Sequence, residues 1–152
     1  MIKIKSELVG GTIRELQTAG AANEEGIVLW LGRRTGPDAG VVQRIYVPLH
    51  EAQSDRFWIS FEGMRAMMDR LRQDRFCLLA QVHSHPDRAF HSQADDQWAL
   101  VRHAGGLSIV VPNFAATTTE ESFWRESAFF QLDNENRWRE IFPDPEIIGV
   151  LR

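Results

Sequence analysis

The chain has 152 residues, a formal net charge of −4, 43% hydrophobic and 25% charged residues, and a single cysteine. This composition is ordinary for one globular domain with one sizeable core, and its acidic balance argues against a broad nucleic-acid-binding surface. A single cysteine excludes an internal disulfide framework and a zinc site built from several cysteines. We expect no signal peptide and no membrane association, because the first residues lack an apolar core and no run of about 18 apolar residues occurs. We therefore place the protein in the cytoplasm.

The first part of the chain predicts a strand, a helix and a hairpin. Residues 1–5 favour a short strand, and residues 6–19 carry apolar side chains at helical spacing, although two glycines weaken that helix. Residues 26–33 form an apolar run typical of a buried strand. A turn containing glycine and proline separates them from a second strand over 41–47, so the two strands are predicted to form a hairpin.

Residues 60–74 give the strongest helix prediction. Ser60 is suited to cap the helix at its start. Five apolar side chains follow at helical spacing, and we expect them to form one stripe against the core: Phe61, Met64, Met67, Met68 and Leu71.

Strands dominate the predictions for the rest of the chain. Residues 76–82 and 107–111 are apolar runs of strand length, and we expect the last two strands over 123–132 and 137–142. A short tail follows from Pro143. Helices and strands mixed in this order predict an α/β or α+β domain with one central sheet, mixed or mostly antiparallel.

The most informative pattern of residues lies directly after the strand 76–82. His83 and His85 stand two residues apart, so their side chains project to the same face of the strand. Ser92 suits the cap of a following helix, and Asp95 falls in its first turn, where a carboxylate is favoured. Two imidazoles and one carboxylate leave a fourth position for water, as in catalytic zinc sites. The pattern predicts metal-assisted hydrolysis, with zinc as the default metal.

Other interpretations of the neighbouring residues are weaker. A serine–histidine–aspartate triad could be drawn here, but it would leave the histidine pair unexplained. Cys77 is expected to be a small buried apolar residue, since no base stands at a recognisable spacing. His91 borders the pattern, where a contact with a metal ligand or with substrate is the alternative to the exposed loop histidine that we expect.

The arrangement His83, His85, a proline, and then Ser92 and Asp95 resembles the signature of the JAMM (MPN-domain) zinc metallopeptidases. The resemblance implies a curved mixed sheet flanked by helices, a cytidine-deaminase-like architecture, over residues 1–152 as a single domain. It also implies that His83, His85 and Asp95 bind Zn²⁺ and that Ser92 stabilises the oxyanion.

The same resemblance implies an upstream glutamate as general base. In the family it precedes by seven residues a glycine that ends an apolar strand, and counting back from Gly32 gives Glu25. Glu24 is adjacent and ranks second. The loop before Ser92 is one residue shorter than in well-known eukaryotic members, which leaves Asp96 as a fallback ligand for Asp95.

The function that the resemblance implies is hydrolysis of the bond after the C-terminal glycine of a ubiquitin-like protein, in a conjugate or a precursor. A metal-bound water would attack, with Glu25 as general base. The chain lacks the insertions of linkage-selective eukaryotic deubiquitinases and resembles prokaryotic stand-alone members. That form implies a bacterial ubiquitin-like conjugation system, including those used against phage, with E1- and E2-like partners.

Three alternatives stand beside this function. One is maturation of a sulfur-carrier protein by the same chemistry. Another is a catalytically silent MPN scaffold, against which the complete ligand set argues. The third, a zinc nucleobase deaminase, requires a Pro-Cys-x-x-Cys pair that a chain with one cysteine cannot supply.

Overall fold

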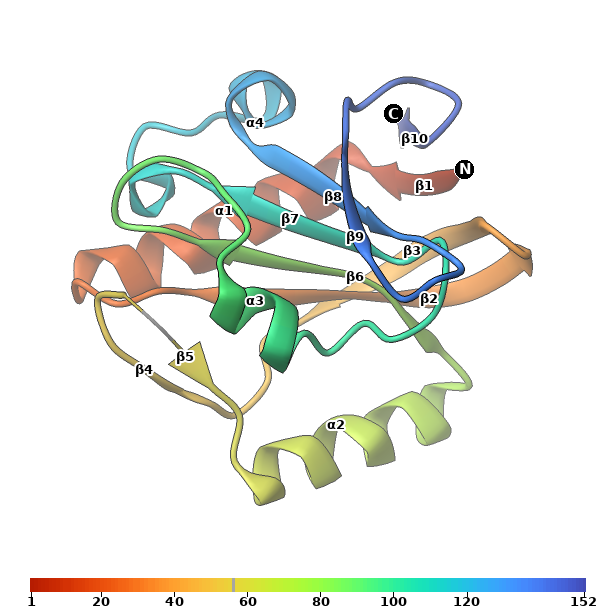
Figure 1. Ribbon diagram of the computed structural model, residues 1–152, viewed down its shortest axis with the longest axis horizontal. Coiled ribbons are helices and arrows are strands. Elements are labelled where there is room, and N and C mark those ends of the chain that lie inside the picture. The colour runs from red at the N-terminus through yellow and green to blue at the C-terminus, as the bar shows by residue number, and fades with distance from the viewer. Residues whose placement is uncertain (56) are drawn as a thin grey trace.

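The computed structural model describes residues 1–55 and 57–152, with the side chain of Trp98 outside that description (Figure 1). Its elements in chain order are β1 (Ile2–Lys5), α1 (Ser6–Ala21), β2 (Ile27–Gly36), β3 (Ala39–Tyr46), β4 (Glu51–Ala52), β5 (Phe57–Trp58), α2 (Phe61–Asp74), β6 (Cys77–Ser84), α3 (Gln93–Trp98), β7 (Leu107–Val111), the short turn η1 (Asn113–Ala115), α4 (Glu120–Glu126), β8 (Ala128–Leu132), β9 (Trp138–Ile141) and β10 (Ile148–Leu151). None of the helices in these ranges is long and apolar enough to cross a bilayer.

One mixed sheet organises the molecule. Among the described residues it has eight strands in the order β10-β1-β3-β2-β6-β7-β8-β9, and β4 pairs with β5 in a separate ribbon (Figure 1). The pairs β1–β3, β1–β10 and β6–β7 are parallel, and the other pairs of the large sheet are antiparallel. The prediction of a mixed sheet flanked by helices is therefore confirmed.

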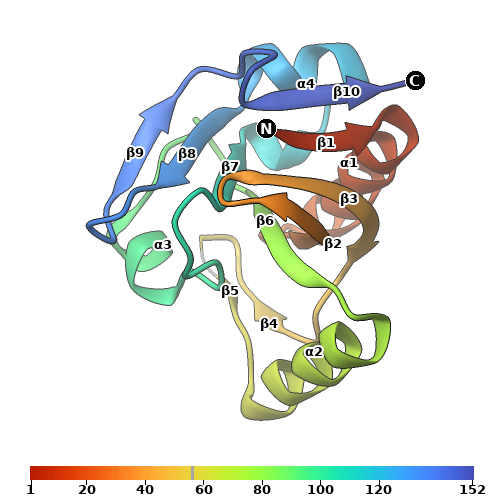
Figure 2. The same cartoon turned by 90° about the vertical axis from the view of Figure 1, so that its right-hand side faces the viewer.

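Helices cover both faces of the sheet, with α1 and α4 on one face and α2 and α3 on the other (Figure 2). The central strand β2 reflects this layering, since Val28 and Trp30 belong to the core under α1, while Ile27, Leu29 and Leu31 belong to the core on the α2 side. A strand buried on both faces has no polar positions to alternate with its apolar ones. That is why β2 appears in the sequence as one continuous apolar run.

The hairpin of β2 and β3 depends on a close backbone approach at Gly32. The register shifts between Leu31 and Gly32, which marks a β-bulge. A Cβ atom on Gly32 would lie 1.9 Å from the carbonyl oxygen of Val41. Only glycine fits this position without moving the backbone of the neighbouring strand.

The predicted strand over 123–132 is wrong in its first half. Thr119 caps helix α4, and its side chain and that of Ser122 each accept a hydrogen bond from the other's backbone N–H. This capping box satisfies two free backbone donors of the first turn. Phe123 then lies on the buried side of α4, 6.3 Å between ring centroids from Trp30. The aromatic run of this segment therefore belongs partly to a helix, and β8 begins only at Ala128.

The predicted tail after Pro143 is also wrong, because it contains β10, which runs parallel to β1 with Ile2 paired to Ile148. Four residues carry too little local periodicity to indicate a strand. The segment becomes a strand because β1 offers it an unpaired edge, and the partner lies at the other end of the sequence.

Helix α2 is confirmed with its cap, since the Ser60 side chain accepts a hydrogen bond from the N–H of Gly63 at 3.1 Å. The prediction that all five apolar side chains of this helix form one stripe against the core is wrong for two of them. Met67 is buried, but Phe61 is 83% exposed and Met68 is 47% exposed. The helix packs only one narrow line of side chains on the sheet, and both exposed residues lie off that line.

Candidate metal centre

His83 and His85 lie at the end of β6, where the strand leaves the sheet. His83 is fully buried and His85 nearly so. Their side chains point the same way, and their Nε2 atoms are 3.2 Å apart. The backbone of His85 is held from both sides, since its N–H donates to the carbonyl of Val111 at 2.9 Å and its carbonyl accepts from the N–H of Phe114 at 2.8 Å. Phe114 itself has a φ of +53°, in a left-handed turn formed by η1.

Asp95 reaches the histidines because the chain must cross over between β6 and β7. These strands are parallel, so the connection has to return along the sheet. Helix α3 lies in that connection and places Asp95 over the end of β6. Asp95 Oδ1 is 3.1 Å from His83 Nε2, and Asp95 Oδ2 is 3.4 Å from His85 Nε2.

The three side chains fit a single metal ion. One ligand atom from each of His83, His85 and Asp95 lies within 4.8 Å of the other two. A tetrahedral zinc ion held about 2.0–2.1 Å from its ligands separates neighbouring ligand atoms by roughly 3.3–3.4 Å. The two histidine Nε2 atoms are 3.2 Å apart, and each faces a different oxygen of Asp95, at 3.1 Å for Oδ1 and 3.4 Å for Oδ2, so each contact is close to that spacing. Two imidazoles and one carboxylate therefore converge as a divalent cation requires.

Proton affinities in the cluster are strongly perturbed. Burial alone would raise the pKa of Asp95, but hydrogen bonds from His83 and His85 hold it well below its usual range. Burial alone would lower the pKa of His85, but its hydrogen bond to Asp95 and the charges of Asp95 and Glu25 raise it on balance. The raised pKa means that His85 holds its proton more strongly than a free imidazole. A metal ion would have to displace that proton, because an imidazole binds metal only in its neutral form.

Glu25 faces the cluster from the segment just before β2. It is 3% exposed, and its Oε1 is 3.9 Å from His85 Nε2. Burial raises the pKa of Glu25 to about 7, although the charge of His85 opposes the shift. Ser84 fixes this segment next to β6, because its hydroxyl accepts a hydrogen bond from the N–H of Gly26 at 2.9 Å. Glu24, the second-ranked residue, is exposed and lies outside the cluster.

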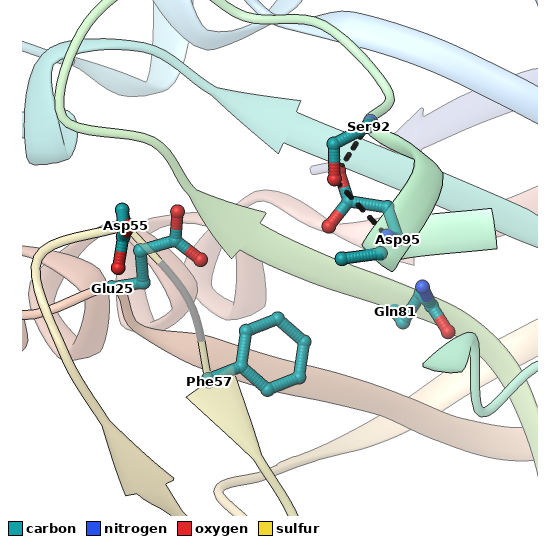
Figure 3. Close-up of a pocket in the computed structure, with 7 residues that line it drawn as sticks. Glu25, Asp55, Phe57, Gln81, Ser92 and Asp95 are labelled. Atoms are coloured by element: carbon teal, nitrogen blue, oxygen red, sulfur yellow. Dashed lines mark hydrogen bonds between the residues drawn. The ribbon is translucent and has the colours of Figure 1, made fainter. Parts of the chain in front are cut away.

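A small pocket of about 30 Å³, enough for a water molecule, opens beside the cluster. Figure 3 shows Glu25 on one side of it and Ser92 and Asp95 on the other, with Phe57 below. The Ser92 hydroxyl accepts from the N–H of Asp95 at 3.1 Å. Its own hydrogen is therefore free to be donated into the pocket. The predicted roles of Glu25 as base and Ser92 as oxyanion donor stay predictions, but both side chains line this pocket.

His91 is a functional candidate that the sequence placed wrongly. We expected an exposed loop residue, but the His91 side chain is only 5% exposed. Its Nδ1 is 2.6 Å from Asp96 Oδ1, and its Nε2 is 3.0 Å from Ser108 Oγ. Burial lowers the pKa of His91. The loop looked solvated because its partners, on β7, β8 and β9, come later in the chain, and no local pattern indicates them.

The fallback ligand and the cysteine take other places. Asp96 points away from the histidine pair, since its side chain is bonded to His91 and is 57% exposed. Cys77 lies at the opposite end of β6, where its thiol is 3.4 Å from the carbonyl of Gly32. Neither residue belongs to the described metal cluster.

Comparisons with known proteins agree with this fold and with a metalloprotease. Residues 11–127 match the family of prokaryotic homologues of the JAB domain. The chain is 31% identical over 144 residues to a probable metalloprotease, y4jG, of Sinorhizobium fredii (strain NBRC 101917 / NGR234), which covers 92% of this chain and 86% of that protein. The solution structure of protein DSY2949 from Desulfitobacterium hafniense has the same fold, with a TM-score of 0.70 at 18% identity over 99% of this chain and 93% of that one. Because the family match spans most of the residues, the chain belongs to the prokaryotic branch of the JAB (JAMM/MPN) domain family.

Proposed function

We propose that residues 1–152 form a single zinc-dependent peptidase or isopeptidase domain that cuts after the C-terminal glycine of a ubiquitin-like protein. The observation that carries the proposal is the convergence of His83, His85 and Asp95 opposite the buried carboxyl of Glu25. Membership of the JAB family and the likeness to a probable metalloprotease support the peptidase class. The substrate would come from a conjugate or a precursor made by a bacterial ubiquitin-like system with E1- and E2-like enzymes.

His83, His85 and Asp95 are the residues that would hold the zinc ion, since imidazole and carboxylate are its usual ligands in hydrolytic sites. When bound, zinc supplies Lewis acidity to the scissile carbonyl and to water.

Glu25 is suited to move the proton. Its carboxyl lies in a pocket with little solvent, and its pKa of about 7 is close to neutral pH. A group whose pKa lies near the working pH can both accept a proton and release it at a small free-energy cost. Glu25 would therefore remove a proton from the attacking water and deliver it to the leaving amine nitrogen.

Ser92 is suited to stabilise the oxyanion. Its hydroxyl oxygen accepts a helix-cap hydrogen bond, which fixes the position of the oxygen and leaves the hydroxyl hydrogen available to the pocket. A fixed donor aimed at a developing negative charge is often the largest single contribution to the rate.

The shape of the pocket supports a glycine-ended substrate. The pocket between Glu25, Phe57 and Asp95 is small, at about 30 Å³, so it would favour a glycine over a bulky residue beside the reacting carbonyl. Strand β5, which carries Phe57, pairs only with β4 among the described strands. An extended tail could therefore add to the other edge of β5, the usual mode of strand recognition.

The test is cleavage of a ubiquitin-like protein fused through a Gly-Gly end to a reporter. We expect the zinc-loaded protein to cut after the glycine, and a chelator to abolish cutting until zinc is restored. Glu25→Gln is expected to retain zinc and lose activity about 10²–10⁴-fold. Its matched control, Glu24→Gln, alters the exposed neighbour and should leave activity unchanged. Cleavage that survives chelation would overturn the mechanism, and equal activity of the two variants would overturn the role of Glu25.

A further inference from the structure

Helix α3, which carries Asp95, is too short to hold its own position. It has six residues, and isolated helices shorter than about 12 residues are marginal in water. Its capping box orders its first turn but does not fix it to the sheet. Something else must hold Asp95 in place above the histidine pair.

A chain of hydrogen bonds fixes the start of α3 to strand β7. His91 stands directly before the capping residue Ser92, and its Nε2 is 3.0 Å from the hydroxyl of Ser108 on β7. The His91 ring packs against the rings of Phe130 on β8 and Trp138 on β9, at centroid distances of 4.8 and 5.2 Å. The residue that leads into α3 is therefore attached to three strands of the sheet.

The same chain continues to the end of α3 through Gln81. The Gln81 side-chain amide donates to the Ser108 hydroxyl at 3.2 Å. Its carbonyl oxygen accepts from the N–H groups of Leu100 and Val101, at 2.7 and 3.1 Å, just after the helix. Gln81 lies on β6 two residues before His83, so it shares the face of the strand that carries both histidines.

With His91 neutral, every bond in this chain has a donor and an acceptor. The Gln81 oxygen accepts two backbone N–H groups, so its nitrogen must donate to Ser108. The Ser108 hydroxyl then gives its hydrogen to His91 Nε2, and His91 Nδ1–H donates to Asp96 at 2.6 Å. Each polar group then has its partner, and burial lowers the pKa of His91, which favours the neutral form.

We propose that His91 is a positioning residue for the metal centre. Together with Ser108 and Gln81 it forms a relay, named here the His91 relay, that anchors both ends of α3 to the strands beside the histidine pair. The relay keeps Asp95 at its observed spacing from His83 and His85, so that an ion finds three ligands already in place. This inference rests on the proposed metal function. It assigns to His91 an effect on metal affinity, although His91 is not itself one of the three ligands.

The test measures zinc affinity and the stability of the metal-free protein in the same set of variants. Zinc affinity is measured by competition with a chelating dye, and stability by urea unfolding of the chelator-treated protein. His91→Ala is expected to weaken zinc binding about 10–100-fold, the usual effect of losing a residue that orients a ligand. Ser108→Ala removes one hydroxyl from the same relay and should weaken binding in the same direction. The double variant should be no weaker than the worse single variant, because both changes break one connection.

His103→Ala is the matched control. His103 is a partly buried histidine, but its Nε2 is bonded to the carbonyl of Leu78 at 2.7 Å, at the far end of β6. Its loss should lower stability and leave zinc affinity within about twofold of wild type.

The outcomes separate this inference from the proposed function. If wild-type protein binds no zinc, the proposed function fails and this inference fails with it. If wild type binds zinc, and His91→Ala loses stability but keeps wild-type affinity, then His91 is merely structural and only the relay is overturned. Should His91→Ala not fold, unchanged zinc affinity in Ser108→Ala overturns the relay by itself.

Discussion

Ser92 and Asp95 each hold the other in place. The N–H of Ser92 donates to Asp95 Oδ2 at 2.7 Å, and the N–H of Asp95 donates to Ser92 Oγ at 3.1 Å. The same Asp95 carboxylate turns its Oδ1 toward His83 at 3.1 Å. One local capping motif therefore orients both the acidic group of the candidate metal centre and the hydroxyl beside the pocket.

This reciprocal cap leads to a prediction that separates the structural role of Ser92 from its chemical role. Ser92→Thr keeps both the cap and the hydroxyl donor, Ser92→Asp keeps only the cap, and Ser92→Ala loses both. We expect Ser92→Ala to lower the free energy of unfolding by about 1 kcal/mol, and Ser92→Asp to leave it close to wild type. Activity should fall about 10²–10³-fold in both of these variants and stay highest in Ser92→Thr. High activity in Ser92→Asp would show that no donor is needed there.

A second prediction compares two adjacent carboxylates. Asp95→Asn removes a charged ligand from the cluster, and we expect zinc affinity to fall by more than the 10–100-fold typical of a residue outside the ligand set. Asp96→Asn changes a carboxylate that is 57% exposed and leaves an oxygen able to accept from His91. Its zinc affinity should stay within about tenfold of wild type. Metal analysis after gel filtration checks both, and a larger loss in Asp96→Asn would restore the fallback ligand.

A third prediction concerns pH and the stability of the metal-free protein. The pKa of Glu25 is raised from 4.5 to about 7 in the folded state. Between these values the folded protein binds a proton that the unfolded chain has released, so stability falls as pH rises through this window. The full shift corresponds to about 3 kcal/mol, and partial solvent screening reduces this to on the order of 2 kcal/mol.

Urea unfolding between pH 5 and pH 8 checks this prediction, with Glu25→Gln as the reference. Glutamine resembles the protonated carboxyl and does not titrate, so the stability difference between wild type and variant should change across the window. A difference that is constant with pH would show that the Glu25 carboxyl is not held protonated by its burial.

A fourth prediction compares two glycines of β2. A Cβ on Gly32 would lie 1.9 Å from the carbonyl oxygen of Val41, whereas a Cβ on Gly36 would meet only the Ala39 side chain at 3.5 Å. Gly32→Ala should therefore lower the free energy of unfolding by about 3 kcal/mol or more, because the neighbouring backbone has to move. Gly36→Ala should change it by less than about 1 kcal/mol. Similar stability of the two variants would mean that the bulge can relax.

Much of the metal cluster could be predicted from the sequence because its spacing is local. Alternate residues of a strand share a face, which places His83 beside His85 whatever the rest of the fold is. The distance from Ser92 to Asp95 is that of a capping box, so the cap and its acidic partner follow from the helix start alone. The apolar run of β2 and the helix α2 were likewise visible as patterns of neighbouring residues.

The sequence did not show what depends on partners far along the chain. Thr119 and Ser122 do carry a local cap signal, but the aromatic residues after them suggested a strand until Phe123 was seen packed against Trp30. Strand β10 exists because β1 gives it an edge to pair with. His91 is buried because strands that follow it supply Ser108 and two aromatic rings.

The sequence by itself determined which residues could bind a metal and how His83 and His85 face, because the side-chain direction along a strand or in a helical turn is set by a few neighbouring residues. Only the tertiary structure decided that Glu25, rather than Glu24, faces His85 from the segment before β2, and that His91 is buried against β7. Burial and strand pairing are properties of the assembled chain, and they depend on contacts between segments whose order in the sequence says little about their distance in space.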